Sequence, residues 1–180
     1  GLFDPALAPA ADLPTLKQQI WRSQEDMLDR AAQVWDADSH LRGEVIDVGC
    51  GLGGGPLYWA ERYGARVTAL TPVPGHLPLI ARCAERAGVA SRVTPLLGDA
   101  HTVPGERLFD AAVATGASNY FDRARWFARL SGLLRPGGRV FIEDTFVGRD
   151  EVIATFNAYC LSKWWRLSAD QAAAALPGFG

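Results

Sequence analysis

A cluster of glycines between a short apolar segment and a helical pattern constrains this chain more than any other feature. Val45–Val48 is apolar and β-branched apart from Asp47, as expected of a buried strand. Gly49-Cys50-Gly51-Leu52-Gly53 follows directly, and a helical pattern begins at Pro56. Such a turn lets a ligand approach the backbone, because glycine has no Cβ. The helix that follows the turn points its free N–H groups at that ligand. We therefore expect a strand–turn–helix unit with a binding site at the carboxyl end of the strand.

Apolar segments of strand length alternate with helical patterns through the central region. Further strands are predicted at residues 66–70, 93–97, 110–114 and 139–143. Helices are predicted at residues 16–35, 56–63, 76–87, 123–134, 152–165 and 168–176. The helix at 123–134 is expected to end at Pro136-Gly137-Gly138. This alternation predicts an α/β fold: a three-layer, doubly wound and mostly parallel sheet with helices on both faces.

Composition excludes several classes of function. With 48% hydrophobic and 21% charged residues, the chain of 180 residues is typical of a globular protein. A net charge of −2 does not favour binding to nucleic acid or to an anionic membrane surface. No apolar run reaches the roughly 20 residues of a membrane span, and no secretory signal is visible. Cys50, Cys83 and Cys160 are widely spaced, which suits reduced thiols in the cytoplasm and indicates no metal site.

The glycine cluster alone leaves two classes of cofactor open. Gly49, Gly51 and Gly54 match the spacing of a dinucleotide site, so a nucleotide-dependent oxidoreductase is one interpretation. Such an enzyme usually carries an acid after its second strand to bind the ribose hydroxyls, and here that position is Thr71. Asp99 follows the third strand, where a carboxylate can accept a hydrogen bond from an exocyclic amine such as that of adenine. The second interpretation is therefore an adenosine-containing cofactor of another kind.

Four blocks of the sequence together resemble the class I S-adenosylmethionine-dependent methyltransferases. They are Val45–Gly53, Gly98-Asp99-Ala100, Phe109-Asp110 and Leu133–Arg139, within about residues 44–145. The resemblance implies a seven-stranded sheet in the order 3-2-1-4-5-7-6, with S-adenosylmethionine as methyl donor and S-adenosylhomocysteine as product. Thr71 is similar to the threonine found there in cyclopropane-fatty-acid synthases and in tocopherol and terpenoid C-methyltransferases.

The resemblance assigns the methionine part of the cofactor to the first loop. Gly49, Gly51 and Gly53 match the glycines of the family, and Asp47 matches the acid that helps to hold the amino group. Thr115, after the fourth strand, is a further expected cofactor contact.

The ribose and adenine contacts are expected after the second and third strands. Thr71 and His76 are predicted to share the ribose, because His76 occupies the position where related subgroups have glutamine. Asp99 and Ala100 match the adenine-binding pair. His101 either lines the adenine pocket or faces water.

The acceptor side is less clearly marked. Gly116 stands where many family members have glutamate, which removes an obvious general base and leaves a non-catalytic cofactor-binding module as an alternative. Asn119 and Tyr120 are the candidates to face the methyl group. Glu143, with Asp144 beside it, is the nearest candidate acid.

Aromatic residues favour an apolar acceptor. They gather after the fifth strand, where the family places its substrate cap, and on the first helix: Phe146, Phe156, Tyr159, Trp164, Trp165, Trp21 and Trp35. Aromatic faces stabilise a cationic intermediate, so C-methylation of a terpenoid or aromatic metabolite is favoured over O- or N-methylation.

The predicted organisation has three parts. Residues 1–40 form an arm and a helix that cover the site, residues 41–146 form the cofactor-binding core, and residues 147–180 form a partial helical cap. No alternating pattern follows Phe146, so the family's last two strands are expected to be absent, as in a fragment or trimmed chain. A fifth strand with an open edge is expected to pair with a partner segment or a second copy of the chain, or to lower stability.

Overall fold

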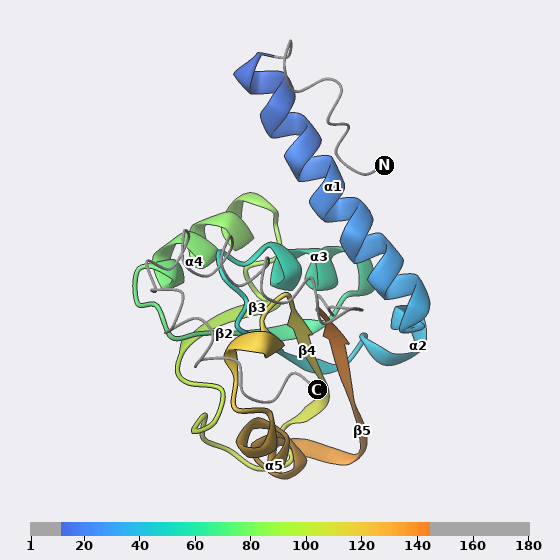
Figure 1. Cartoon of the computed structure of the whole chain (residues 1–180), viewed down its shortest axis with the longest axis vertical. Coiled ribbons are helices and arrows are strands. Elements are labelled where there is room, and N and C mark those ends of the chain that lie inside the picture. The colour runs from blue at the N-terminus through green and yellow to red at the C-terminus, as the bar shows by residue number, and fades with distance from the viewer. Residues whose placement is uncertain (1–11, 145–180) are drawn as a thin grey trace, which may run out of the picture. The chain divides into compact units, whose positions relative to one another are not determined.

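The computed structural model describes residues 12–144, which fold around one parallel sheet (Figure 1). The strands are β1 (Glu44–Val48), β2 (Arg66–Thr71), β3 (Val93–Leu97), β4 (Phe109–Thr115) and β5 (Leu134–Glu143). The helices are α1 (Leu13–Val34), α2 (Ala37–His40), α3 (Gly54–Tyr63), α4 (His76–Arg86) and α5 (Arg123–Leu133), with a 3₁₀ turn η1 (Ser118–Tyr120). The strand order is β3-β2-β1-β4-β5, and every pair is parallel. This confirms the predicted α/β fold and the first five positions of the expected strand order.

The largest difference from the predicted boundaries is at β5. This strand begins at Leu134, five residues before the predicted start, because Leu134 leaves the helix with extended backbone and pairs with Phe109. A register shift between Phe109 and Ala111 then accommodates the Pro136-Gly137-Gly138 segment inside the strand. The proline and glycines therefore interrupt a strand rather than end a helix. The helices predicted at 152–165 and 168–176, and the expected cap, lie outside the described residues.

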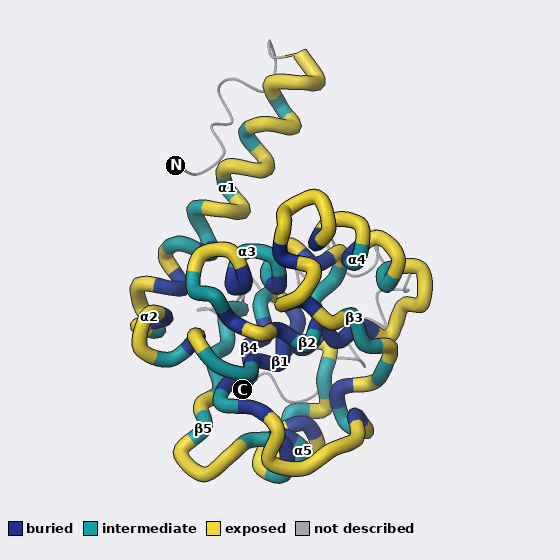
Figure 2. Tube along the Cα trace, turned by 180° about the vertical axis from the view of Figure 1, so that it is seen from behind, coloured by how far each residue is buried: buried dark blue, intermediate teal, exposed yellow. Residues whose placement is uncertain are grey.

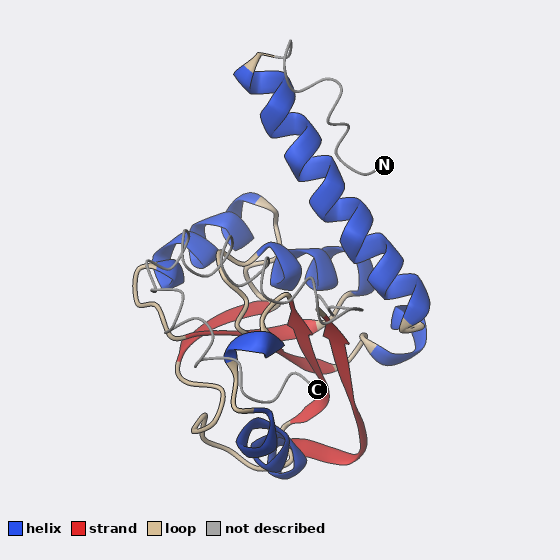
Figure 3. Cartoon of the chain, viewed as in Figure 1, coloured by secondary structure: helices blue, strands red, loops and turns tan. Residues whose placement is uncertain are grey.

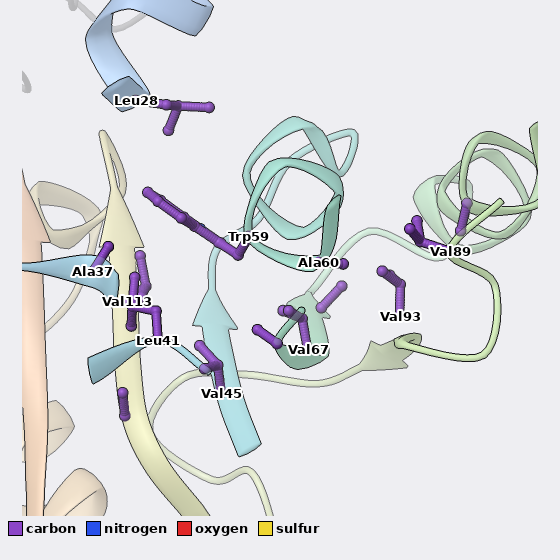
Figure 4. Close-up of a cluster of buried hydrophobic side chains, with 14 of the residues drawn as sticks. Leu28, Ala37, Leu41, Val45, Trp59, Ala60, Val67, Val89, Val93 and Val113 are labelled. Atoms are coloured by element: carbon purple, nitrogen blue, oxygen red, sulfur yellow. The ribbon is translucent and has the colours of Figure 1, made fainter. Parts of the chain in front are cut away.

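The two faces of the sheet bury different cores, as the two-residue period of a strand requires. Val45, Val67 and Val113 face α3 and α4, where Trp59 is fully buried among them. Figure 4 shows the Trp59 indole between α3 and the strands that carry Val45 and Val113. On the other face, Ile46 and its neighbours pack against Trp126 and other residues of α5. Figure 3 shows α3 and α4 on one side of the strands and α5 on the other.

Helix α1 is anchored by its second half. Asp12 caps its start by accepting a hydrogen bond from the Thr15 N–H at 2.9 Å. Leu28 is buried near the other end, and the Tyr58 hydroxyl of α3 donates to Asp29. Trp21, in the first half, is 64% exposed. Figure 2 shows the first half of α1 mostly in the colour of exposed residues. Only the second half of this helix is therefore held to the core by the described residues.

The two aromatic residues predicted for α1 and its end differ in role. Trp35 packs against Trp59 and Phe141, with ring centroids 5.7 and 5.4 Å apart, so it belongs to the core. Trp21 has no such packing in the described part of the chain. None of the helices between residues 12 and 144 is long and apolar enough to cross a membrane. Over the same residues, β5 pairs with β4 alone, and the prediction about its other edge stays a prediction.

Candidate functional site

Four loops meet at the carboxyl edge of the sheet and carry the predicted site residues. They follow β1, β2, β3 and β4, and all these strands run in the same direction. The strand order reverses between β1 and β4, where the chain leaves one half of the sheet and starts the other. Open α/β sheets bind ligands in the crevice at such a switch point. The predicted cofactor residues are therefore on the correct edge for one shared site.

The glycine loop is closed on one side and open on the other. The N–H groups of Gly49 and Cys50 both donate to the Leu70 carbonyl, at 2.9 and 3.1 Å, which fixes the loop against β2. Gly53 has φ +93°, and a Cβ there would lie 2.9 Å from Cγ1 of Ile80. Gly51 has φ +55°, and no atom lies within 4 Å of the Cβ position. The loop thus packs tightly against α4 and exposes bare backbone at Gly51, as a ligand cradle requires.

Asp47 is a buried carboxylate behind this loop. It is 2% exposed and accepts a hydrogen bond of 3.1 Å from Nε1 of Trp59. Burial raises the pKa of Asp47 to about 7, while the Trp59 hydrogen bond acts in the opposite direction. Burial likewise raises the pKa of the Cys50 thiol to about 12, and the Asp47 charge adds to this effect. Cys50 therefore stays a thiol at neutral pH, and Asp47 would gain from a cation placed beside it.

Thr71 and His76, the two residues predicted to share the ribose, lie in contact. Oγ1 of Thr71 is 3.0 Å from Nδ1 of His76 and accepts a hydrogen bond of 3.2 Å from the Val73 N–H. Since that hydroxyl already accepts from Val73, its own proton can be donated to Nδ1. The imidazole then carries its proton on Nε2, as a donor for an incoming hydroxyl. Thr71 is 1% exposed, so its rotamer is held by packing.

Asp99 and His101 form a second contact pair after β3. Oδ1 of Asp99 accepts from the backbone N–H of His101 and lies 2.8 Å from Nδ1 of the same residue. The hydrogen bond from the His101 N–H lowers the pKa of Asp99. Ala100 between them is buried. The His101 side chain is 15% exposed, so it is mostly covered and only partly open to water.

The loop after β4 forms a polar cluster with the end of β5. Oδ2 of Asp144 accepts hydrogen bonds from Oγ of Ser118 at 2.5 Å and from the Asn119 N–H at 3.0 Å. Oγ1 of Thr115 and Oδ1 of Asn119 are buried and have no hydrogen-bond partner among residues 12–144. Buried polar atoms are rarely left unpaired, so these two atoms suit a bound polar group.

Asp144 replaces Glu143 as the candidate acid on the acceptor side of the site. Burial raises the pKa of Glu143, and the nearby Asp144 charge adds to it. The Asp144 carboxylate is the one that the side chain of Ser118 and the backbone of Asn119 hold against the loop after β4. Tyr120 is 57% exposed, and its pKa is raised by burial and by Asp144. Sequence reasoning missed Ser118, whose only signal is its place in the loop after β4.

No metal centre is evident in the described part of the chain. Residues 12–144 contain no group of three or more His, Cys, Asp or Glu side chains placed to hold a metal ion. The site is instead a set of backbone donors, hydroxyls and separate carboxylates.

Comparison with known proteins gives this arrangement a family. The sequence profile of the family described as "Methyltransferase domain" matches residues 45–138. Erythromycin 3''-O-methyltransferase of Saccharopolyspora erythraea is 35% identical over 104 residues, which are 56% of this chain and 34% of that protein. The probable chloroplastic tocopherol O-methyltransferase of Oryza sativa subsp. japonica is 29% identical over 144 residues, 79% of this chain and 39% of that protein.

A solved structure shares the fold over part of this chain. Geranyl diphosphate methyltransferase in complex with GPP and sinefungin is 28% identical, with a TM-score of 0.55, and the match covers 62% of this chain and 44% of that one. The chain thus spans between a third and two fifths of the length of the two curated relatives described above. The family match covers more than half of the chain and includes the glycine loop, Thr71 and Asp99. This chain belongs to the methyltransferase domain family.

Proposed function

We propose that this chain binds S-adenosylmethionine at the glycine loop and takes part in transfer of its methyl group to a small, mostly apolar metabolite. The observation that carries the proposal is the open backbone at Gly51, at the same sheet edge as Asp47, Thr71 and Asp99. These residues offer an acid for an ammonium group, hydroxyl-binding groups for a ribose and an acid for an exocyclic amine. Together these groups match the parts of an adenosyl amino acid.

The fit assigns each part of the cofactor to residues of this chain. Asp47 takes the amino group, because its buried carboxylate has only Trp59 as hydrogen-bond donor among the described residues. Thr71 and His76 take the ribose hydroxyls, and Asp99 takes the adenine amine. Thr115, at the end of β4, offers an Oγ1 that has no hydrogen-bond partner among the described residues.

Positioning is the main contribution expected of the protein. When bound, S-adenosylmethionine supplies an electrophilic methyl group on a positively charged sulfur. The residues around it need to hold the acceptor in line with that methyl group and to exclude water. Hydrogen bonds from Ser118 and Asn119 to Asp144 fix the loop after β4, which lies on the acceptor side.

Methylation of a carbon atom remains the proposed reaction, because the sequence is rich in aromatic residues where the acceptor is expected. The five aromatic residues that follow β5 in the sequence lie outside the described residues, and Tyr120 is an exposed aromatic residue in the described loop after β4. A carbon acceptor loses its proton late or passes through a cation, which an aromatic face stabilises.

An oxygen acceptor is a second candidate, favoured by Asp144. A hydroxyl that becomes methylated must lose its proton, and a carboxylate at the end of β5 is a group that can accept it. The curated relatives described above, which act on erythromycin and tocopherol by their names, are O-methyltransferases.

Calorimetry followed by methyl transfer tests the proposal. The chain should bind S-adenosylhomocysteine and should not bind NADH; binding of NADH alone would favour an oxidoreductase. Methyl-labelled S-adenosylmethionine should then label terpenoid or phenolic acceptors. Asp144→Asn should slow transfer to a phenol far more than transfer to an alkene. Binding of S-adenosylhomocysteine without transfer to any acceptor would support a non-catalytic module.

A further inference from the structure

The side chain of His101 bridges the loops after β3 and β4. Its Nδ1 is 2.8 Å from Oδ1 of Asp99, and its Nε2 accepts a hydrogen bond of 3.0 Å from the backbone N–H of Asp122. Asp122 caps the start of α5 through its own side chain, which accepts from the Arg125 N–H at 3.1 Å. One imidazole therefore connects the loop that carries Asp99 to the start of α5.

These two bonds determine where the imidazole proton lies. Because a backbone N–H can only donate, Nε2 of His101 must be the acceptor and carries no proton. The proton of the neutral ring is then on Nδ1, where it is donated to Asp99. A neighbouring carboxylate usually selects a tautomer in this manner, and here the Asp122 N–H makes the same selection from the other side.

The ring is held more firmly than the carboxylate that it contacts. The His101 side chain is 15% exposed, whereas that of Asp99 is 55% exposed. The ring of Phe121 meets the imidazole edge to face, with centroids 6.2 Å apart. Left alone, a half-exposed carboxylate would rotate among several orientations. Contact with a packed ring limits that rotation.

The two oxygens of Asp99 have different surroundings. Oδ1 receives both donors of His101, the backbone N–H and Nδ1–H. No described residue donates a hydrogen bond to Oδ2. The carboxylate is thus held by one oxygen with the other available to a ligand donor.

We propose that His101 is a positioning residue that orients Asp99 for an exocyclic amine, and so selects an adenine over a deaminated purine. The proposal rests on the function proposed above. Inosine has a carbonyl where adenosine has the amine, and a carbonyl cannot donate to Oδ2 of Asp99. Two acceptors that face each other repel and gain no hydrogen bond, which disfavours the inosyl ligand.

Binding of two ligands by the wild-type chain and its variants tests this. The probes are S-adenosylhomocysteine and S-inosylhomocysteine, measured by calorimetry. His101→Phe should weaken binding of the adenosyl ligand about tenfold, the value of a charge-assisted hydrogen bond, and should reduce the preference over the inosyl ligand by a similar factor. His40→Phe is the control, because His40 stacks on Phe141 and lies at the opposite edge of the sheet.

Conservative variants separate positioning from folding. His101→Asn keeps a donor near the Nδ1 position and should retain most of the preference for adenine. His101→Gln places its amide nearer the Nε2 position and should retain thermal stability but lose the preference. Unchanged preference in His101→Phe would overturn the proposal, and so would equal loss in all three variants.

A spectroscopic measurement covers the case in which a variant fails to fold. Long-range ¹H–¹⁵N correlations of the wild-type chain should show His101 with its proton on Nδ1; a proton on Nε2 would overturn the proposal. Failure of the wild-type chain to bind either ligand would instead contradict the proposed function. The tautomer result would still report on the bridge itself.

Discussion

The indole Nε1–H of Trp59 donates to Oδ2 of Asp47 at 3.1 Å, and both side chains are buried. It is the one hydrogen bond that the described residues donate to this carboxylate. A buried carboxylate normally accepts several hydrogen bonds, so one donor leaves Asp47 poorly compensated when it is charged. Its pKa of about 7 follows from that imbalance. The imbalance is relieved if a ligand brings a positive charge to the carboxylate.

The first prediction concerns the stability of the ligand-free chain. The pKa of Asp47 is about 7 in the folded chain and 3.8 for an aspartate in water, so the folded state keeps a proton that the unfolded state has lost between these values. Below pH 4 both states hold the Asp47 proton, and the contribution of this residue to the free energy of unfolding is fully present. That contribution falls by up to about 4 kcal/mol as the pH rises to 7. Asp47→Asn should remove this loss and unfold at higher urea concentration than wild type at pH 8. Lower stability of Asp47→Asn at pH 8 would contradict the assignment.

The second prediction concerns ligand binding and pH. An amino acid ligand with a protonated amino group needs Asp47 ionised, so binding below pH 7 must release the Asp47 proton. Affinity for S-adenosylhomocysteine should therefore rise with pH from 5 to 7, by up to about tenfold per unit, and level off above 7. Calorimetry in buffers of different ionisation enthalpy should detect the released proton. Asp47→Asn should bind more weakly with a flat profile; a flat profile in wild type would refute the role.

The third prediction separates backbone strain from ligand contact. Gly51→Ala places a Cβ at φ +55° in open space, so it should cost only about 1–2 kcal/mol in stability but greatly weaken S-adenosylhomocysteine binding. Gly88→Ala is the matched control, since Gly88 has φ +73°, has open space around it and follows α4. Its cost in stability should be similar and its ligand affinity unchanged. Both are measured by thermal unfolding and calorimetry. Equal affinity of the two variants would exclude Gly51 from the cradle.

Much of this fold could be predicted because local patterns and packing agree. The predicted strand at 93–97 matches β3, and Val45–Val48 differs from β1 by one residue, because short apolar segments are also the segments that pair in the parallel sheet. The start of β5 could not be placed. Leu134 looks like the last residue of a helix, and only its pairing with Phe109 makes it extended. Such pairing depends on a distant segment, which a local pattern does not contain.

The residues of the candidate site likewise divide into those that the sequence predicts and those that depend on distant contacts. Gly51, Thr71 and Asp99 were placed by strand ends, which the topology brings to one edge. The role of His101 could not be assigned, because its partner Asp122 is 21 residues away along the chain. Contact between Asp144 and Ser118 spans 26 residues and depends on β4 lying beside β5. Long-range contacts of single side chains carry no periodic signal in the sequence.

The last prediction concerns the hydroxyl of Thr71. Thr71→Val keeps the shape of this buried side chain but leaves the Val73 N–H and Nδ1 of His76 without their partner. We expect a loss of about 1–3 kcal/mol in unfolding free energy, whereas Thr71→Ser, which keeps the hydroxyl, should lose less. If the Thr71–His76 pair binds the ribose, wild type should prefer S-adenosylhomocysteine over its 2′,3′-dideoxy analogue. That preference should shrink in Thr71→Val and persist in Thr71→Ser. A preference that is the same in all three proteins would place the ribose elsewhere, even if the stability loss is as expected.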